Sequence, residues 1–168
     1  MTLVDYIRHQ IGMTHWGGAE AFADLTDEQF NWAPSRANSI AVTLLHAYGI
    51  EDAFIQGKLL DQPQLWDSGG WATKVGVAEI PDLGNGWAGM REVTLAKEPI
   101  LAYGQAVYAA TDRCLTTLTP EALDKPMQLG PRTGTVADLL SILVVHNLIH
   151  AGEISALKGC LGLQGQPV

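Results

Sequence analysis

Two histidines, His146 and His150, stand four residues apart in an apolar run of helix length, TVADLLSILVVHNLIHAGEISALKGC, which extends from Thr135 to Cys160. On an α-helix this spacing places both side chains on the same side, about 40° apart around the axis. Two imidazoles placed in this way can bind one metal ion, but they cannot complete its coordination shell. We therefore look for further ligands elsewhere in the chain.

His46 is our candidate for the third ligand. It lies in a second apolar run, at the border of a helix face that is otherwise made of small and apolar groups. If the two helices are neighbours, three imidazoles converge on one point. Three neutral histidines with an open position form a site of the catalytic kind, suited to Zn²⁺ or Ni²⁺, with room for water or a substrate thiolate. Histidines of the core or the surface that bind no metal are the open alternative.

Glu153 lies on the same helix face as this pair, three residues after His150. Its carboxylate is either a fourth ligand or an acceptor for the second nitrogen of a ligating imidazole. The alternative is a side chain in solvent, or one paired with Lys158. The sequence leaves these possibilities open.

Two better-known metal motifs are excluded by their residues. Asn147 occupies the position where the HExxH helix of a zinc protease has its general base, so a protease is excluded. A di-iron carboxylate bundle needs Glu-x-x-His pairs on two helices, whereas here a single pair occurs in reverse order. Cys114 and Cys160 form no CxxC motif, and we interpret both as core residues.

Four helical patterns position these residues. The pattern of the first helix is weakened by Gly12, Gly17 and Gly18, and Lys125 to Gly134 contains the glycines and prolines of a loop. The predicted helices are Leu3 to about Ala23 capped by Thr2, Ile40 to about Leu60 after Ser39, about Pro99 to Leu118, and the run capped by Thr135. With no convincing strand alternation, the sequence predicts an all-α four-helix bundle that forms one domain over residues 1–168.

A long segment without periodicity, Asp61 to Lys97, connects the second and third helices. It contains Trp66, Trp71 and Trp87, three of the five tryptophans. Tryptophan content argues against disorder, and so long a connection in a compact domain is usually functional. We predict an ordered crossover whose tryptophans pack over the bundle or over a partner subunit.

Composition narrows the class of partner. The net charge of −8 and the pI near 4.9 argue against nucleic-acid binding. The N-terminus shows no signal peptide and no uninterrupted apolar run of about 18 residues predicts a membrane span, so we expect a cytoplasmic protein.

We predict an exposed His9 and a His15 without a local partner. Four basic residues are candidates for binding an anion by charge alone, with solvated surface as the alternative: Arg91, Lys97, Arg113 and Arg132.

The chain resembles the DinB-like superfamily of metalloproteins. The resemblance rests on Leu44-Leu45-His46 in the second helix, the long crossover, and His146-x3-His150-Ala-Gly-Glu-Ile in the fourth, and it covers nearly the whole chain. It implies a four-helix bundle of up-down-down-up topology, with a long crossover between helices 2 and 3. It also implies that His46, His146 and His150 bind a divalent metal.

The function implied by this resemblance is a metal-dependent thiol S-transferase. Characterised members of the superfamily include transferases and isomerases that use mycothiol or bacillithiol, and many members are homodimers. The expected partners are a low-molecular-weight thiol, a small electrophilic substrate and a second copy of the chain. The sequence shows no general base or nucleophile near the triad, so a non-catalytic dimeric bundle with a structural metal, or with none, is the alternative.

Overall fold

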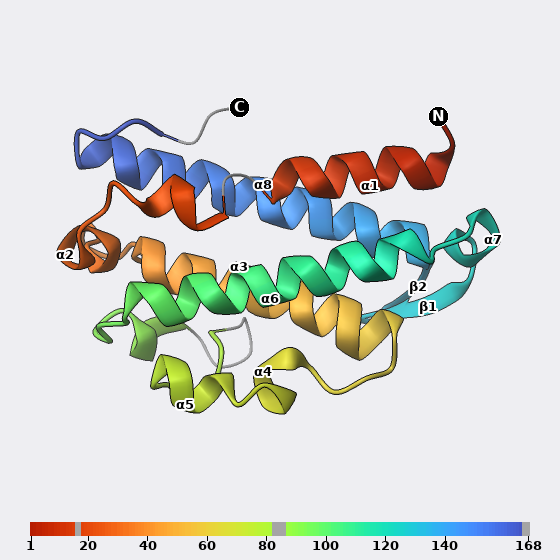
Figure 1. The fold of residues 1–168 in the computed structure, drawn as a ribbon, viewed down its shortest axis with the longest axis horizontal. Coiled ribbons are helices and arrows are strands. Elements are labelled where there is room, and N and C mark those ends of the chain that lie inside the picture. The colour runs from red at the N-terminus through yellow and green to blue at the C-terminus, as the bar shows by residue number, and fades with distance from the viewer. Residues whose placement is uncertain (16–17, 82–86, 166–168) are drawn as a thin grey trace.

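Four long helices lie side by side along the long axis of the molecule (Figure 1). The computed structural model describes residues 1–15, 18–81 and 87–165. In Figure 1, α3 and α6 run in one direction, and α1 and α8 run in the opposite direction. The four helices are α1 Leu3–Thr14, α3 Ile40–Asp52, α6 Lys97–Thr116 and α8 Val136–Cys160. The predicted helical class is therefore confirmed.

Shorter elements connect these helices. Within the residues that the structure describes, these are the 3₁₀-helices η1 and η3, a π-helix η2, four short α-helices and a two-stranded sheet. In chain order they are η1 Gly18–Phe22, α2 Asp27–Asn31, η2 Ala53–Leu59, α4 Leu65–Ser68, α5 Trp71–Val75, η3 Trp87–Met90, α7 Pro120–Leu123, β1 Pro126–Leu129 and β2 Arg132–Thr135.

Side-chain caps fix the starts of three of the four long helices, α1, α3 and α8, where the sequence predicts them. Thr2 and Thr135 each accept a hydrogen bond from the backbone three residues on, and an aspartate there bonds back, which completes two capping boxes. The Ser39 hydroxyl accepts a bond from the Val42 N–H at the start of α3. These local contacts set the register of the helices that carry the histidines.

The first helix is shorter than predicted. It ends at Thr14, not near Ala23, and the His15 N–H bonds back to the carbonyl of Gly12. Glycine has low helix propensity, and the helix ends directly after the segment that contains it. The chain then resumes as η1, while Gly17 lies outside the described residues.

The second helix follows its predicted path to Leu59 but changes type on the way. The α-helix ends at Asp52, and Ala53–Leu59 form a π-helix. A π-helix is rare and frequently lies at a functional site. No side-chain pattern in the sequence predicts it. The change begins directly after two buried acidic residues, Glu51 and Asp52.

The segment predicted as a loop from Lys125 to Gly134 forms a β-hairpin. Strands β1 and β2 pair antiparallel, with Leu129 opposite Arg132, and Gly130 adopts a φ of 63° at the turn between them. The prediction was wrong because each strand has only four residues, too few for a clear period of two, and because proline and glycine disfavour strands.

The crossover packs on the bundle, one of the two predicted arrangements. The rings of Trp66 and Trp71 lie 5.3 and 5.5 Å from the ring of Tyr103 on α6. The Asp52 carboxylate accepts hydrogen bonds from the N–H groups of Leu65 and Trp66, which ties the start of α4 to α3. Residues 82–86 of the crossover lie outside the described residues.

Helix α8 is long and apolar enough to cross a membrane by length and composition alone. A core helix of a soluble protein meets the same criteria. Here α8 lies against α1 and α3 in the bundle, with Leu139, Leu140 and Leu143 completely buried. Only 28% of its most apolar 18-residue window is buried, so much of its apolar surface faces outward.

Candidate metal centre

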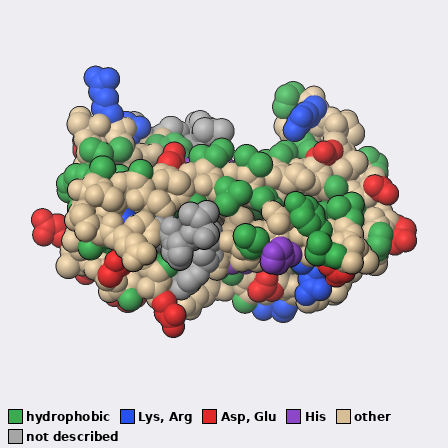
Figure 2. Space-filling model, turned by 90° about the horizontal axis from the view of Figure 1, so that it is seen from above, with side chains coloured by type: hydrophobic (Ala, Val, Ile, Leu, Met, Phe, Trp, Pro, Cys, Tyr) green, Lys and Arg blue, Asp and Glu red, His purple; other side chains and the backbone are tan. Residues whose placement is uncertain are grey.

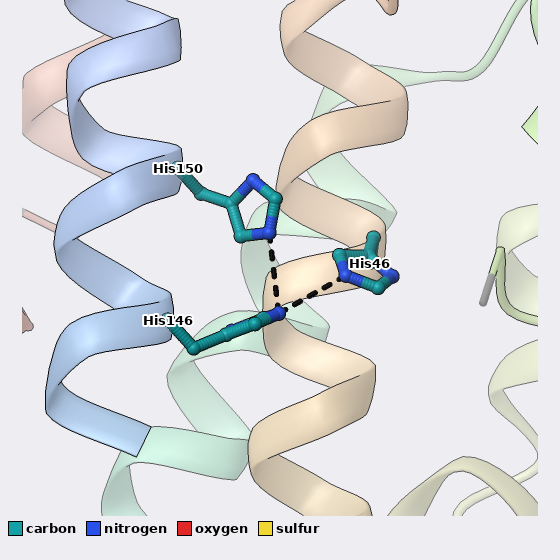
Figure 3. Close-up of side chains that lie close together, drawn as sticks. All are labelled: His46, His146 and His150. Carbon is teal, nitrogen blue, oxygen red and sulfur yellow. Dashed lines mark hydrogen bonds between the residues drawn. The ribbon is translucent and has the colours of Figure 1, made fainter. Parts of the chain in front are cut away.

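The three histidines selected from the sequence meet between α3 and α8 (Figure 3). The Nε2 atom of His146 lies 3.0 Å from Nε2 of His46 and 3.2 Å from Nε2 of His150. One ring nitrogen from each residue lies within 4.8 Å of the other two. Helical spacing alone brings His146 and His150 together, whereas His46 arrives because α3 and α8 are neighbours.

Two of these rings offer their second nitrogen, Nδ1, to a nearby oxygen. The Nδ1 atom of His46 lies 2.5 Å from the carbonyl oxygen of Pro81, and that of His150 lies 2.7 Å from Oε2 of Glu153. Carbonyl and carboxylate oxygens accept hydrogen bonds, so Nδ1 is the donor in each neutral ring. This tautomer leaves an Nε2 lone pair that points into the centre.

The third ring has a side-chain amide in the same role. The Nδ1 atom of His146 lies 3.5 Å from Oδ1 of Asn147, a long hydrogen bond. The amide nitrogen of Asn147 donates to Oε2 of Glu51 at 2.8 Å. Since a carboxylate only accepts, the Asn147 amide must turn its nitrogen to Glu51 and its oxygen to His146.

Burial keeps the central ring neutral. Loss of solvent, together with the neighbouring rings of His150 and His46, lowers the pKa of His146 to about 4. At neutral pH the ring therefore carries no charge, and its Nε2 lone pair is free to bind a cation.

The donor set fits a divalent metal. The Nε2 atom of His146 lies within hydrogen-bond distance of the other two, and with Nδ1 protonated in each ring the three lone pairs converge on one point. Three imidazoles are a ligand set that suits Zn²⁺, Ni²⁺ and related ions and leaves a coordination position open. Oxygen acceptors on the opposite nitrogens are the partners that ligating histidines usually have. The group formed by His46, His146 and His150 could thus hold a metal ion.

Trp87 covers one side of the centre. Its ring lies 4.2 Å from the ring of His46 and 6.1 Å from that of His150. His46 is only 3% exposed, and the side chain of His150 is 12% exposed. The crossover thus contributes both an acceptor, through Pro81, and part of the shelter. Trp87 is one of the crossover tryptophans predicted to pack over the bundle, whereas the carbonyl of Pro81 has no signature in the sequence.

Glu153 belongs to the surroundings of the centre and not to its converging nitrogens. It accepts a hydrogen bond from His150, and it is not a member of the group of possible ligand atoms. The alternative pair with Lys158 is wrong. The Lys158 ammonium is buried and bonds to Asp24 at 3.0 Å and to the carbonyl of Ala21.

A pocket of about 400 Å³ begins at Glu153 and extends along α8 away from the triad. Arg36 lies in its lining, and Arg91 bonds to the pocket residue Asn38 at 3.2 Å. Exposed Cys160 also lines it, which corrects the prediction that both cysteines are core residues; Cys114 alone is buried. The full lining is Pro34, Arg36, Ala37, Asn38, Thr43, Glu153, Ala156, Leu157 and Cys160.

A second polar cluster, which the sequence reasoning missed, surrounds Glu51. This side chain is fully buried and accepts hydrogen bonds from His15 at 2.8 Å, Thr111 at 2.6 Å and Asn147 at 2.8 Å. The expectation that His15 lacks a local partner holds only along the sequence, because its partner lies 36 positions away. His9 is exposed, as predicted. An acidic pair in an otherwise apolar helix was the one available signal.

Comparison with known proteins places the chain in a family. A crystal structure of a conserved protein from Enterococcus faecalis shares the fold with a TM-score of 0.82 and 20% sequence identity, and the match covers 96% of this chain and 99% of that one. Comparison with curated proteins gives no match. The family model of the DinB superfamily matches residues 19–154, which include all three histidines. The protein therefore belongs to the DinB superfamily.

Proposed function

We propose that this protein is a metal-dependent thiol S-transferase in which His46, His146 and His150 hold Zn²⁺ or Ni²⁺. The observation that carries the proposal is the meeting of three Nε2 atoms, with contacts of 3.0 and 3.2 Å, while each Nδ1 faces an oxygen acceptor. A divalent ion held there supplies positive charge that lowers the pKa of a bound thiol and favours the nucleophilic thiolate.

The chain's own residues orient the ligands and shape the substrate space. Pro81, Asn147 and Glu153 hold the three rings in one tautomer, and Trp87 limits access of water. The pocket beside Glu153 has the volume of a small-molecule site, and Arg36 in its lining suits a thiol that bears an anionic group. In the transfer, sulfur bonds to the electrophilic carbon and the leaving group departs with the electron pair of the broken bond.

The test combines metal content with a panel of thiols. We expect protein purified without chelators to contain about one Zn²⁺ or Ni²⁺ per chain. We also expect it to accelerate the reaction of one low-molecular-weight thiol, among cysteine, glutathione, mycothiol and bacillithiol, with an electrophile such as chlorodinitrobenzene. His150→Ala should lose metal and activity, whereas His9→Ala, which changes an exposed histidine, should keep both. Protein without metal, which neither Zn²⁺ nor Ni²⁺ stabilises, contradicts the proposal.

A non-catalytic bundle with a structural metal is the second candidate. It is favoured because Glu153, the carboxylate among the described residues that bonds to one of the three imidazoles, already accepts a hydrogen bond from His150. The same variant separates the two candidates. If His150→Ala unfolds the protein, the metal is structural; if it loses metal and remains folded, the open site of an enzyme is favoured.

We also propose that two copies of the chain associate through α1 and α8. These neighbouring helices carry large apolar side chains on their outer surfaces, and Figure 2 shows hydrophobic groups gathered on the half of this face where α1 lies. Each of these side chains is 47–58% exposed: Leu3, Tyr6, Met13, Val145, Leu148 and Ile149. Contiguous apolar surface of this kind commonly marks an interface. Light scattering should give the mass of a dimer, and Ile149→Glu should give that of a monomer.

Two finer assignments complete the proposal. The directions of the four long helices in Figure 1 support the up-down-down-up arrangement of a four-helix bundle. Free thiols at both Cys114 and Cys160 support a cytoplasmic location, where thiols stay reduced.

A further inference from the structure

Two adjacent acidic residues at the end of α3 are buried with almost no solvent contact. Glu51 is 0% exposed and Asp52 is 1% exposed, and each carboxylate accepts three hydrogen bonds. Burying a carboxylate costs free energy unless hydrogen bonds compensate for the lost water. The bonds that each of these two carboxylates accepts therefore stabilise the fold. Their surroundings nevertheless differ in one respect.

The hydrogen bonds of Asp52 join α3 to the crossover and to α6. Its oxygens accept from the N–H groups of Leu65 and Trp66 and from the hydroxyl of Tyr103, all on the side of the crossover and α6. None of these groups contacts an imidazole of the triad in the hydrogen bonds of the described residues. Asp52 therefore provides a matched reference for the chemistry of its neighbour.

Glu51, in contrast, is linked to the triad through one side chain. Its Oε2 atom holds the amide nitrogen of Asn147 at 2.8 Å, and the same amide turns its oxygen to Nδ1 of His146. The hydroxyl of Thr14 takes a further, longer bond from the amide nitrogen at 3.3 Å. Without Glu51 the amide loses its only charged acceptor, and with it the strongest reason to present oxygen to His146.

A small cavity brings Glu51 close to the triad on a second path. It measures about 10 Å³, and Glu51 and His150 both line it, together with Asn147 and Tyr108. So little space holds at most one water molecule. The negative charge of Glu51 is therefore separated from the metal centre by few polarisable groups, and screening between them is weak.

We propose that Asn147 and Glu51 are positioning residues for the metal centre. Asn147 fixes the tautomer and direction of the His146 ring, and Glu51 fixes Asn147 while placing a negative charge near the bound cation. This inference rests on the proposed metal function and extends it, because it explains why asparagine occupies the position after the first histidine of the pair. The change of a group that holds a ligating histidine typically weakens metal affinity 10–100-fold.

The experiment compares three variants of the full-length protein: Asn147→Ala, Glu51→Gln and Asp52→Asn. Co²⁺ serves as the probe, since its visible absorption reports both affinity and coordination geometry. The melting temperature of each metal-free variant reports fold stability independently. We expect Asn147→Ala and Glu51→Gln to weaken Co²⁺ binding by about tenfold or more and to alter its spectrum. We expect Asp52→Asn to change the Co²⁺ affinity by less than about twofold, even if its melting temperature falls as much as that of the other two variants.

The outcomes are distinct. Unchanged Co²⁺ affinity in both Asn147→Ala and Glu51→Gln overturns the inference, as does a loss of affinity that follows melting temperature equally in all three variants. If Glu51→Gln does not fold, the Co²⁺ affinity of Asn147→Ala alone tests the inference. A wild-type protein that binds no Co²⁺, Zn²⁺ or Ni²⁺ overturns the proposed function itself, which distinguishes that failure from a failure of this inference.

Discussion

Two polar clusters lie between the same two helices, a few residues apart, and they are satisfied in opposite ways. At Glu51 the carboxylate oxygens meet donors from α6, from α8 and from His15, which directly follows α1, so the carboxylate is satisfied within the protein. At His46, His146 and His150 three Nε2 atoms converge, with that of His146 lying 3.0 Å from that of His46 and 3.2 Å from that of His150. The first arrangement stabilises the fold as it stands, and the second could hold a metal ion. Local chemistry therefore distinguishes the Glu51 cluster, whose polar groups are satisfied by the protein itself, from the triad, which is a candidate binding site.

The largest effect that tests this contrast is on stability. Glu51→Ala removes the acceptor for three buried donors, so it should lower the free energy of unfolding of the metal-free protein by about 3–5 kcal/mol. Glu92→Ala, at an exposed acidic residue, should change it by no more than about 0.5 kcal/mol. Urea denaturation measures both. A loss below about 1 kcal/mol for Glu51→Ala would mean that the cluster does not hold the helices together.

The opposite pattern is expected at the triad. His146→Ala should change the stability of the metal-free protein by about 1–2 kcal/mol, less than Glu51→Ala does, because the ring's hydrogen-bond contacts are to Asn147 and two other imidazoles and not to a charged carboxylate. The same variant should lose the stabilisation that metal gives the wild type, about 2.7 kcal/mol at one hundred times the Kd. Thermal unfolding with and without Zn²⁺ checks this, with His9→Ala as the control. If the metal-free variant unfolds, the contrast between the two clusters fails.

The parts of the fold that the sequence predicts well are those fixed by local contacts. Thr2, Ser39 and Thr135 mark helix starts because their hydroxyls bond within the next turn. The hairpin and the π-helix after Asp52 escaped prediction, since strands of four residues have no readable period and a π-turn has no side-chain pattern. Local propensity therefore predicts the framework better than its irregular parts.

The candidate site divides in the same way. Spacing within one helix predicts that His146 and His150 are adjacent, and His46 is added as a candidate from a second apolar helix, in agreement with the family resemblance. The acceptors around them depend on tertiary structure: Pro81 contributes a backbone carbonyl, which any residue possesses, and Glu51 finds His15 across 36 positions. Asn147 was considered only as a missing protease base, although its amide contacts both clusters. Residues that support a site are thus harder to predict than those that form it.

The last test concerns a dependence of stability on pH that belongs to the triad. Burial and the neighbouring rings lower the pKa of His146 from 6.5 to about 4. Between these values the unfolded chain binds a proton that the folded protein does not, so stability is full above about pH 6.5 and falls as the pH drops to about 4. The melting temperature of the metal-free wild type should therefore fall relative to that of His146→Ala on acidification over this range. Parallel curves would show that the His146 ring already carries a proton in the folded protein. That result would remove the lone pair on which the contrast between the two clusters depends.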